Sequence, residues 1–169
     1  KFVRSFGKEY HGGGHGIDIR KDNGQEFLYL CDVKNRLVAK ATLTGEQLWK
    51  MSFPSEAGLY QKIEQFNPTN VAFGPDGGFY VADGYGSSYI HQYNDKGDWI
   101  RSWGGAGKEP GQMSTPHGQW LDDRPGRGQI GSSCGHGSGD LGVDAVGVAQ
   151  RRRVRDPQPG DAVVEPVED

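Results

Sequence analysis

Two histidines occupy the same place in an internal repeat. His15 begins the run HGIDI and His117 begins HGQWL, while the corresponding run between them, TNVAF, begins with Thr69. Neutral imidazole is a common zinc ligand, and three imidazoles with one open coordination position form a catalytic zinc site. Zinc binding is one hypothesis for this pair. The other is that His15 and His117 are polar residues held by water or by the backbone.

The repeat itself consists of short apolar runs separated by turn residues. From Pro68 to Trp103 there are four such runs, NVAF, FYVAD, SYIHQY and WIRSW. The alternation of side chains in SYIHQY is typical of a strand, and the Asp-Gly and Lys-Gly pairs supply the positive φ that tight hairpins need. Four antiparallel strands in roughly forty residues predict a meander of the size of a propeller blade.

Other parts of the chain match this unit. KFVRSFG at 1–7 matches DWIRSWG at 98–104, and FLYLCD at 27–32 matches FYVAD at 79–83. A repeated four-stranded unit is a propeller signature, because one blade cannot bury both of its faces alone. We therefore predict an all-β fold of the β-propeller class, with residues 1–7 as the last strand of one blade.

The repeat also sets the expected domain boundaries. Residues 1–124 should form a partial propeller with complete blades at about 13–54 and 66–104 and a third blade begun at 116. About two and a half blades cannot close a ring, so we expect the chain to be a piece of a longer protein. The first strand of each blade lines the central channel, so His15 and His117 should converge on the axis. In a six-bladed ring, histidines on alternate blades would stand about 120° apart.

The composition changes near Arg124. Residues 125–169 contain no aromatic residue and no lysine, and are rich in Gly, Arg and Pro. One interpretation is a disordered tail, because such a segment buries too little apolar surface to offset its ordering entropy. The other is an aberrant segment produced by a shifted reading frame in a GC-rich gene.

Charge and composition exclude several partners. The formal net charge is −3, which does not favour binding to nucleic acid or to an anionic membrane. No apolar run approaches the length of a membrane span, and no signal peptide is visible in this sequence. Cys31 lies inside an apolar run, so we expect a buried thiol there rather than half of a disulfide.

Four segments together resemble a known family: PTNVAF, FYVADGYGSSYI, SWGG and EPGQMSTPHG. The repeats look like NHL repeats, and the chain resembles the lyase domain of peptidylglycine alpha-amidating enzymes (peptidylamidoglycolate lyase) and, still more, its bacterial relatives. The resemblance covers roughly residues 1–124. It implies a six-bladed propeller that holds zinc through three histidines and calcium as a structural ion in the channel. It also implies a secreted or periplasmic protein that splits a small-molecule or peptide carbinolamide into an amide and glyoxylate.

The resemblance assigns roles to individual residues. His15 in GGGHGI and His117 in TPHG match two zinc-ligand motifs, and Tyr85 in ADGYG matches the catalytic tyrosine. The backbone carbonyl of Ile17 matches a position that faces calcium. One departure is Gly86, where animal relatives have a cysteine. The third histidine and the arginines that bind the substrate carboxylate fall in blades beyond this sequence, so the chain alone is not expected to be a working lyase.

Structural roles remain alternatives for several of these residues. Tyr85 could be an aromatic residue packed at a turn, Asp83 is expected to cap a turn, and His91 to be a structural strand residue. Two functions from different classes are therefore carried forward. One is a zinc-dependent lyase; the other is a non-catalytic NHL propeller that binds a protein or glycan, because propellers host many unrelated functions.

Overall fold

The computed structural model describes residues 1–122 and 129–134. Its first sheet is an antiparallel meander whose strands are β1 (Gly14–Asp22), β2 (Gln25–Asp32), β3 (Leu37–Thr42) and β4 (Gln47–Met51). The β1–β2 hairpin turns at Asn23 and Gly24, which both have positive φ, at 50° and 85°. Asn and Gly adopt this conformation most readily, so the turn residues fix the register of this hairpin. We call this sheet the first blade.

The second blade repeats the first. It contains β5 (Asn70–Phe73), β6 (Phe79–Ala82), β7 (Tyr89–Tyr93) and β8 (Trp99–Gly104), also in the order of the sequence. Gly77 and Gly97 provide the positive φ at two of its turns. The four runs seen in the sequence thus form four strands.

A third sheet is represented by two antiparallel strands, β9 (Pro116–Asp122) and β10 (Gln129–Cys134). Strand β10 lies inside the segment 125–169 for which disorder or a shifted reading frame was expected. The remainder of that segment lies outside the described residues.

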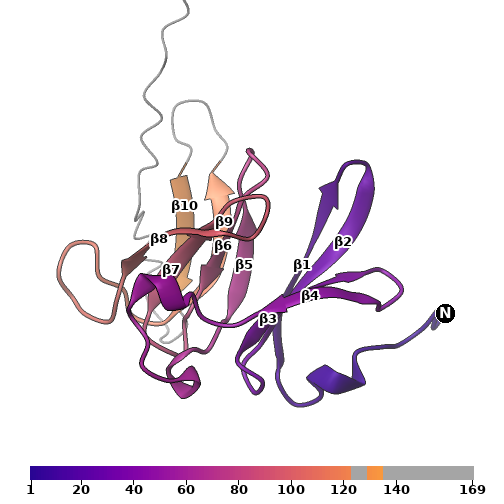
Figure 1. Cartoon of the computed structure of the whole chain (residues 1–169), viewed down its shortest axis with the longest axis horizontal. Coiled ribbons are helices and arrows are strands. Elements are labelled where there is room, and N and C mark those ends of the chain that lie inside the picture. The colour runs from indigo at the N-terminus through magenta and orange to yellow at the C-terminus, as the bar shows by residue number, and fades with distance from the viewer. Residues whose placement is uncertain (123–128, 135–169) are drawn as a thin grey trace, which may run out of the picture.

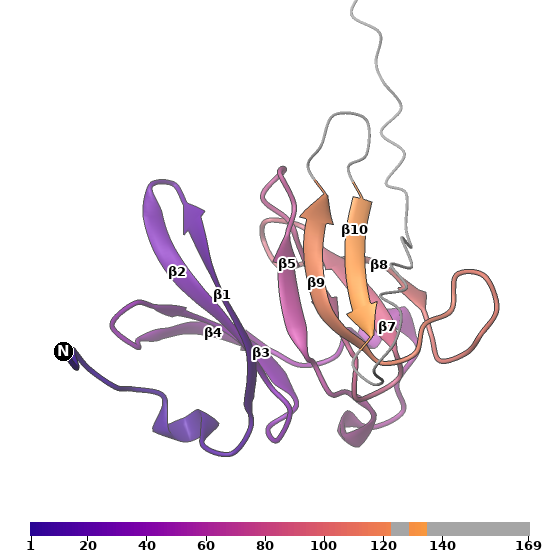
Figure 2. The same ribbon diagram turned by 180° about the vertical axis from the view of Figure 1, so that it is seen from behind.

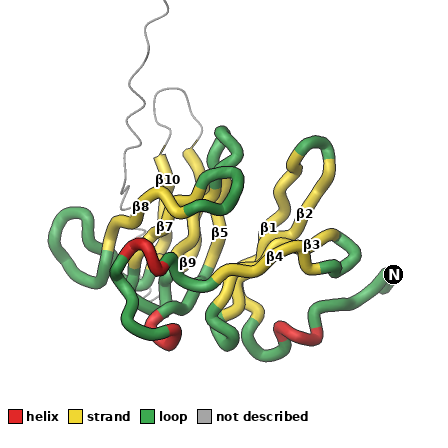
Figure 3. The backbone as a smooth tube through the Cα atoms, viewed as in Figure 1, coloured by secondary structure: helices red, strands yellow, loops and turns green. Residues whose placement is uncertain are grey.

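The sheets fan out around their first strands (Figures 1 and 2). Strand β5 contacts both β1 and β9, so the first strands of three successive sheets are neighbours. The tube view in Figure 3 shows that nearly all regular structure is strand. This is the arrangement of a β-propeller, with two whole blades and two strands of a third among the described residues.

Apolar residues pack on both faces of the second blade. Between the two blades, a cluster joins Tyr29 and Val38 of the first blade to Val71, Phe79 and Val81 of the second. On the opposite face of the second blade, Ala72, Tyr80, Ala82 and Ile90 pack with Met113 and Leu121. These two layers fix the position of each first strand relative to the next.

The expectation that residues 1–7 form a strand is wrong. They form no strand, and Phe2 and Val3 are about four-fifths exposed. The fourth strand of a blade bonds only to the third strand of the same blade, and no strand among residues 1–122 and 129–134 pairs with this segment. The segment instead leads into η1 (Lys8–Tyr10), with Phe6 packed over Gly45 in the β3–β4 turn.

Helical structure is limited among the described residues. Besides η1 there are two 3₁₀ turns in the crossing between the blades, η2 (Ser55–Ala57) and η3 (Ile63–Gln65). None of these helices in residues 1–122 and 129–134 has the length and apolarity needed to cross a membrane.

Candidate functional site

Three aromatic side chains from separate segments meet where the blades converge. His15 lies near the start of β1, His117 near the start of β9, and Tyr85 in the loop between β6 and β7. The ring centroids of His15 and His117 are 4.7 Å apart, and that of Tyr85 is 5.1 Å from His15 and 5.3 Å from His117. The fold therefore brings both predicted zinc ligands and the predicted catalytic tyrosine into one cluster.

The hydrogen bond of His15 determines which of its nitrogens can bind a metal. Its Nδ1 lies 2.8 Å from the backbone oxygen of Thr69. A carbonyl oxygen only accepts hydrogen bonds, so Nδ1 carries the proton and donates it. In the neutral ring Nε2 then keeps its lone pair. Metal-binding histidines commonly have this arrangement, in which the second ring nitrogen donates to a carbonyl and fixes the ring orientation.

Tyr85 contacts His117 directly. Its hydroxyl oxygen lies 2.6 Å from Nε2 of His117, while the residue remains 45% exposed. A buried turn aromatic would be covered by the blade, so this exposure places the phenol at an accessible surface. A substrate group held beside the His117 imidazole would therefore lie within proton-transfer distance of the Tyr85 hydroxyl.

The loop that carries Tyr85 is held by the carboxylate of Asp83. Its Oδ1 accepts from the backbone N–H of Asn67, and its Oδ2 accepts from that of Ser87, both at 2.6 Å. Tyr85 also donates its backbone N–H to the Asn67 carbonyl. Asp83 is fully buried, so this turn cap fixes the loop from beneath.

A chain of hydrogen bonds that passes through the buried His91 leads from the outer strand β8 to Asp83. Tyr60 donates to Oδ2 of Asp83 at 2.8 Å and lies 2.6 Å from Nε2 of His91. On its other side, His91 Nδ1 lies 2.7 Å from the Ser102 hydroxyl oxygen, which accepts from the indole N–H of Trp99. Because the Tyr60 proton goes to Asp83, Nε2–H of His91 donates to Tyr60 and the Ser102 hydroxyl donates to Nδ1.

Burial sets the charge states in this chain. It lowers the pKa of His91 to about 3 and raises the pKa of Tyr60 above its usual range. Burial also raises the pKa of Asp83, against the lowering effect of its backbone N–H bonds. His91 is therefore a neutral, fully buried residue with both nitrogens bonded.

The residues present could supply part of a zinc ligand set. His15 and His117 provide two adjacent imidazoles of the right chemistry. The residues that the structure describes contain no group of three or more His, Cys, Asp or Glu side chains that could hold a metal. Ile17, whose carbonyl was expected to face calcium, lies in β1 just beyond a register shift that begins at Gly14.

Gly86 lies where animal relatives were expected to have cysteine. A Cβ there would collide with the Asp83 carboxylate and with the backbone oxygen of Gln65. The loop in this chain is therefore built around a glycine, and a side chain at this position would require a different loop conformation.

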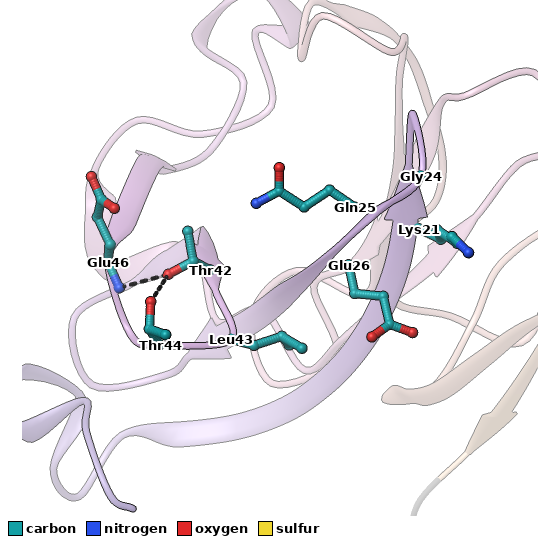
Figure 4. A pocket seen from close by; sticks show the side chains of 8 residues that line it. All are labelled: Lys21, Gly24, Gln25, Glu26, Thr42, Leu43, Thr44 and Glu46. Atoms are coloured by element: carbon teal, nitrogen blue, oxygen red, sulfur yellow. Dashed lines mark hydrogen bonds between the residues drawn. The ribbon is translucent and has the colours of Figure 1, made fainter.

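One surface hollow lies away from this cluster. It occupies about 600 Å³ between the β1–β2 and β3–β4 turns of the first blade (Figure 4). Lys21 at its edge is six residues along β1 from His15, or about 20 Å at the usual rise of a strand. Thr42 bonds Thr44 and the backbone of Glu46 there, which are turn contacts. The hollow is thus at the opposite end of the blade from the histidines.

A second hollow of about 240 Å³ lies beside His15, on the face of the first blade that points away from the second blade. Phe6, Tyr10 and Leu30 are among its lining residues.

Comparison with curated proteins shows a similarity over most of this chain. The chain is 32% identical over 136 residues to peptidyl-glycine alpha-amidating monooxygenase A of Xenopus laevis, a match that covers 77% of this chain. The chain spans 14% of the length of that relative.

Among solved structures, the chain is similar to virginiamycin B lyase from Staphylococcus aureus. The TM-score is 0.48 with 16% identity, over 74% of this chain and 39% of that one. No protein-family model matches the chain.

Two residues with clear roles around the cluster were not predicted as site residues. Thr69 was recognised only as the counterpart of the histidines in the second blade, and its backbone oxygen in fact bonds His15. Tyr60 comes from the crossing between blades, outside the repeat, so no repeat signal points to it. The structural roles expected for Asp83 and His91 agree with their burial and hydrogen bonds.

Proposed function

We propose that this chain is part of a zinc-dependent propeller lyase that cleaves the C–N bond of a carbinolamide and releases an amide and glyoxylate. The observation that carries the proposal is the cluster of His15, His117 and Tyr85, assembled from three separate segments with ring centroids 4.7–5.3 Å apart. Similarity to an amidating enzyme over 77% of the chain supports it.

Each residue of the cluster has a distinct role in the proposal. His15 would hold zinc through Nε2, because its Nδ1–H is committed to Thr69, and His117 would contribute a second imidazole. The third ligand lies outside the described residues. Zinc, when bound, supplies a Lewis acid that polarises the substrate hydroxyl and lowers its pKa.

Tyr85 is the proposed base. Its phenolate takes the proton of the substrate hydroxyl, the electrons of that O–H bond form the carbonyl of glyoxylate, and the C–N bond breaks. The electrons of the C–N bond stay with the amide nitrogen, which takes up the proton that Tyr85 has accepted. The exposed ring of Tyr85 beside His117 is suited to this step because substrate can reach it.

The proposal also covers the cellular location of the protein and a structural calcium ion. By resemblance, the longer protein is secreted or periplasmic and contains a structural calcium facing the carbonyl of Ile17. Calcium accepts backbone carbonyl ligands readily, which is compatible with a strand residue in this role.

Zinc binding tests the proposal on the chain as it is. We expect zinc to bind, and His15→Ala and His117→Ala each to weaken binding at least about tenfold, because each removes one ligand. His91→Ala is the matched control, since His91 is fully buried and both of its nitrogens are bonded. Isothermal titration with zinc measures all four proteins. Equal zinc affinity in the wild type and both ligand variants contradicts the metal site.

The lyase activity is tested in the longer protein that carries the remaining blades. We expect it to release glyoxylate from an N-acyl-α-hydroxyglycine, and Tyr85→Phe to lower kcat by about 10²–10⁴-fold while zinc content is unchanged. A folded, zinc-free protein that releases no glyoxylate would instead favour a non-catalytic propeller with a protein or glycan ligand.

A further inference from the structure

Thr69 contacts both histidine-bearing strands. It is fully buried in the second blade, at the position that corresponds to His15 in the first blade and His117 in the third. We propose that Thr69 is a positioning residue that braces the two histidines. Its carbonyl orients the His15 ring. Its hydroxyl holds in place the strand that begins at Pro116 and carries His117.

The carbonyl contact acts on His15. The bond of 2.8 Å from His15 Nδ1 runs between blades, so the ring is fixed by the neighbouring sheet rather than by its own strand. The backbone of Thr69 is itself held, because its N–H donates to the Ala82 carbonyl at 2.8 Å. The acceptor for His15 is therefore part of a rigid sheet.

The hydroxyl contact acts on the strand of His117. Oγ1 of Thr69 donates to the carbonyl oxygen of Pro116 at 2.8 Å, and lies 3.3 Å from the Ala82 carbonyl. Pro116 is buried and immediately precedes His117. Without the hydroxyl, the Pro116 carbonyl would lose a donor that water cannot easily replace.

Two glycines allow the neighbouring segments to approach Thr69 closely. A Cβ at Gly16 would collide with the Thr69 carbonyl oxygen, and a Cβ at Gly84 would collide with the Pro116 carbonyl and the Thr69 hydroxyl. Only glycine lets the three backbones approach this closely. Gly84 also lies next to Tyr85, so the brace adjoins the loop of the third member of the cluster.

The function of the brace follows from these contacts. Three successive blades are linked through one residue at the point where the imidazoles lie 4.7 Å apart. A histidine at this position would add a ring, whereas threonine adds one short side chain with a hydroxyl donor. Thr69 thus sets the spacing of the two imidazoles and the tautomer of one of them.

NMR of the metal-free protein tests the brace directly. In the wild type we expect His15 as the Nδ1–H tautomer in long-range ¹H–¹⁵N spectra, with strong NOEs between the His15 and His117 rings. Thr69→Val has the same shape without the hydroxyl, and should weaken those NOEs and shift the His117 resonances. Thr69→Ser keeps the hydroxyl and should restore the wild-type spectra.

A second control separates positioning from general loss of stability. Val71→Ala removes buried volume from strand β5, which begins directly after Thr69, without touching the hydroxyl. It should lower the melting temperature and leave the ring NOEs intact. Unchanged NOEs in Thr69→Val, or an equal loss in Val71→Ala, would overturn the brace.

Zinc affinity provides a second readout, and this part rests on the proposed function. Titrated with zinc alone, Thr69→Val should bind about 10–100-fold more weakly, the usual effect of removing a group that supports a metal ligand. Thr69→Ser and Val71→Ala should stay near the wild-type affinity. If His15→Ala and His117→Ala bind zinc as well as the wild type, the proposed function fails, while the metal-free spectra still decide whether Thr69 is a brace.

Discussion

The two complete blades have the same strand order but differ in how their faces are covered. In the second blade Val71 is 2% exposed, because the first blade packs on that face. Its counterpart in the first blade, Ile17, is 62% exposed. The same repeat position is therefore a core residue in one blade and a surface residue in the other.

This difference shows that the burial of a residue in a blade depends on the neighbouring blades. An apolar residue in the first strand leaves water only when another sheet stands against it. Figure 1 shows why: among the described residues, the second blade has a sheet on each side, whereas the first blade has one on the side of β5 alone.

The interiors of the blades differ as well. His91 of β7 pairs with Val81, and the equivalent strand of the first blade has Ala39 paired with Leu30. The second blade therefore contains the hydrogen-bonded chain through His91 at the position where the first blade has only the methyl group of Ala39. The polar chain ends at Asp83 beneath the Tyr85 loop, so the more polar interior belongs to the blade that supplies the proposed base.

The largest expected effect comes from Phe79. It is 2% exposed and stacks with Tyr93 and Trp49, so Phe79→Ala should lower the free energy of unfolding by about 3–5 kcal/mol. Ile17→Ala on the uncovered face is the matched control and should cost no more than about 0.5 kcal/mol. Urea denaturation measures both. Equal losses of unfolding free energy in the two variants would mean that Phe79 and Ile17 lie on equally buried faces.

The pH dependence of stability should differ between the wild type and His91→Gln. The folded pKa of His91 is about 3, below the unfolded value near 6.5, so the folded state binds fewer protons between these values. The histidine's contribution is present above pH 6.5 and is lost as the pH falls toward 3, at up to about 1.4 kcal/mol per pH unit.

Asp83 acts in the opposite direction, because burial raises its pKa and favours the folded state as the pH falls. The quantity to measure is therefore the difference between the urea-denaturation stabilities of the wild type and His91→Gln at each pH. This difference should change with pH between 6.5 and 4. Parallel curves would show that His91 titrates normally in the folded protein.

The smallest effect is expected at Cys31. The thiol is fully buried and free, and burial raises its pKa, so iodoacetamide should modify it only after unfolding. The second blade has Ala82 at the equivalent position, and Cys31→Ala should therefore cost only about 1 kcal/mol. Mass spectrometry of the labelled peptide measures the reaction. Rapid labelling of the native protein would show that the first blade opens readily.

The sequence determined the strands and the pairing of equivalent positions. Period-two alternation and Asp-Gly or Lys-Gly turns are local signals, so β5 to β8 could be predicted from the residues of that segment alone. The repeat also aligned His15 with His117. Because the first strands of propeller blades line one central axis, the sequence could predict that these two side chains lie close together. Residues 1–7 show the limit of this reasoning, because a strand-like sequence forms no strand without a neighbour to bond.

Tertiary structure alone decided which groups support the cluster. The bond from His15 to the Thr69 carbonyl and the bond from Tyr60 to Asp83 join residues from different blades or from outside the repeat. Sequence patterns report periodicity along one segment, whereas these bonds depend on how closely separate sheets approach. That distance is set by side-chain packing and by glycines such as Gly84, so the repeat predicted where the histidines lie and the packing decided how they are held.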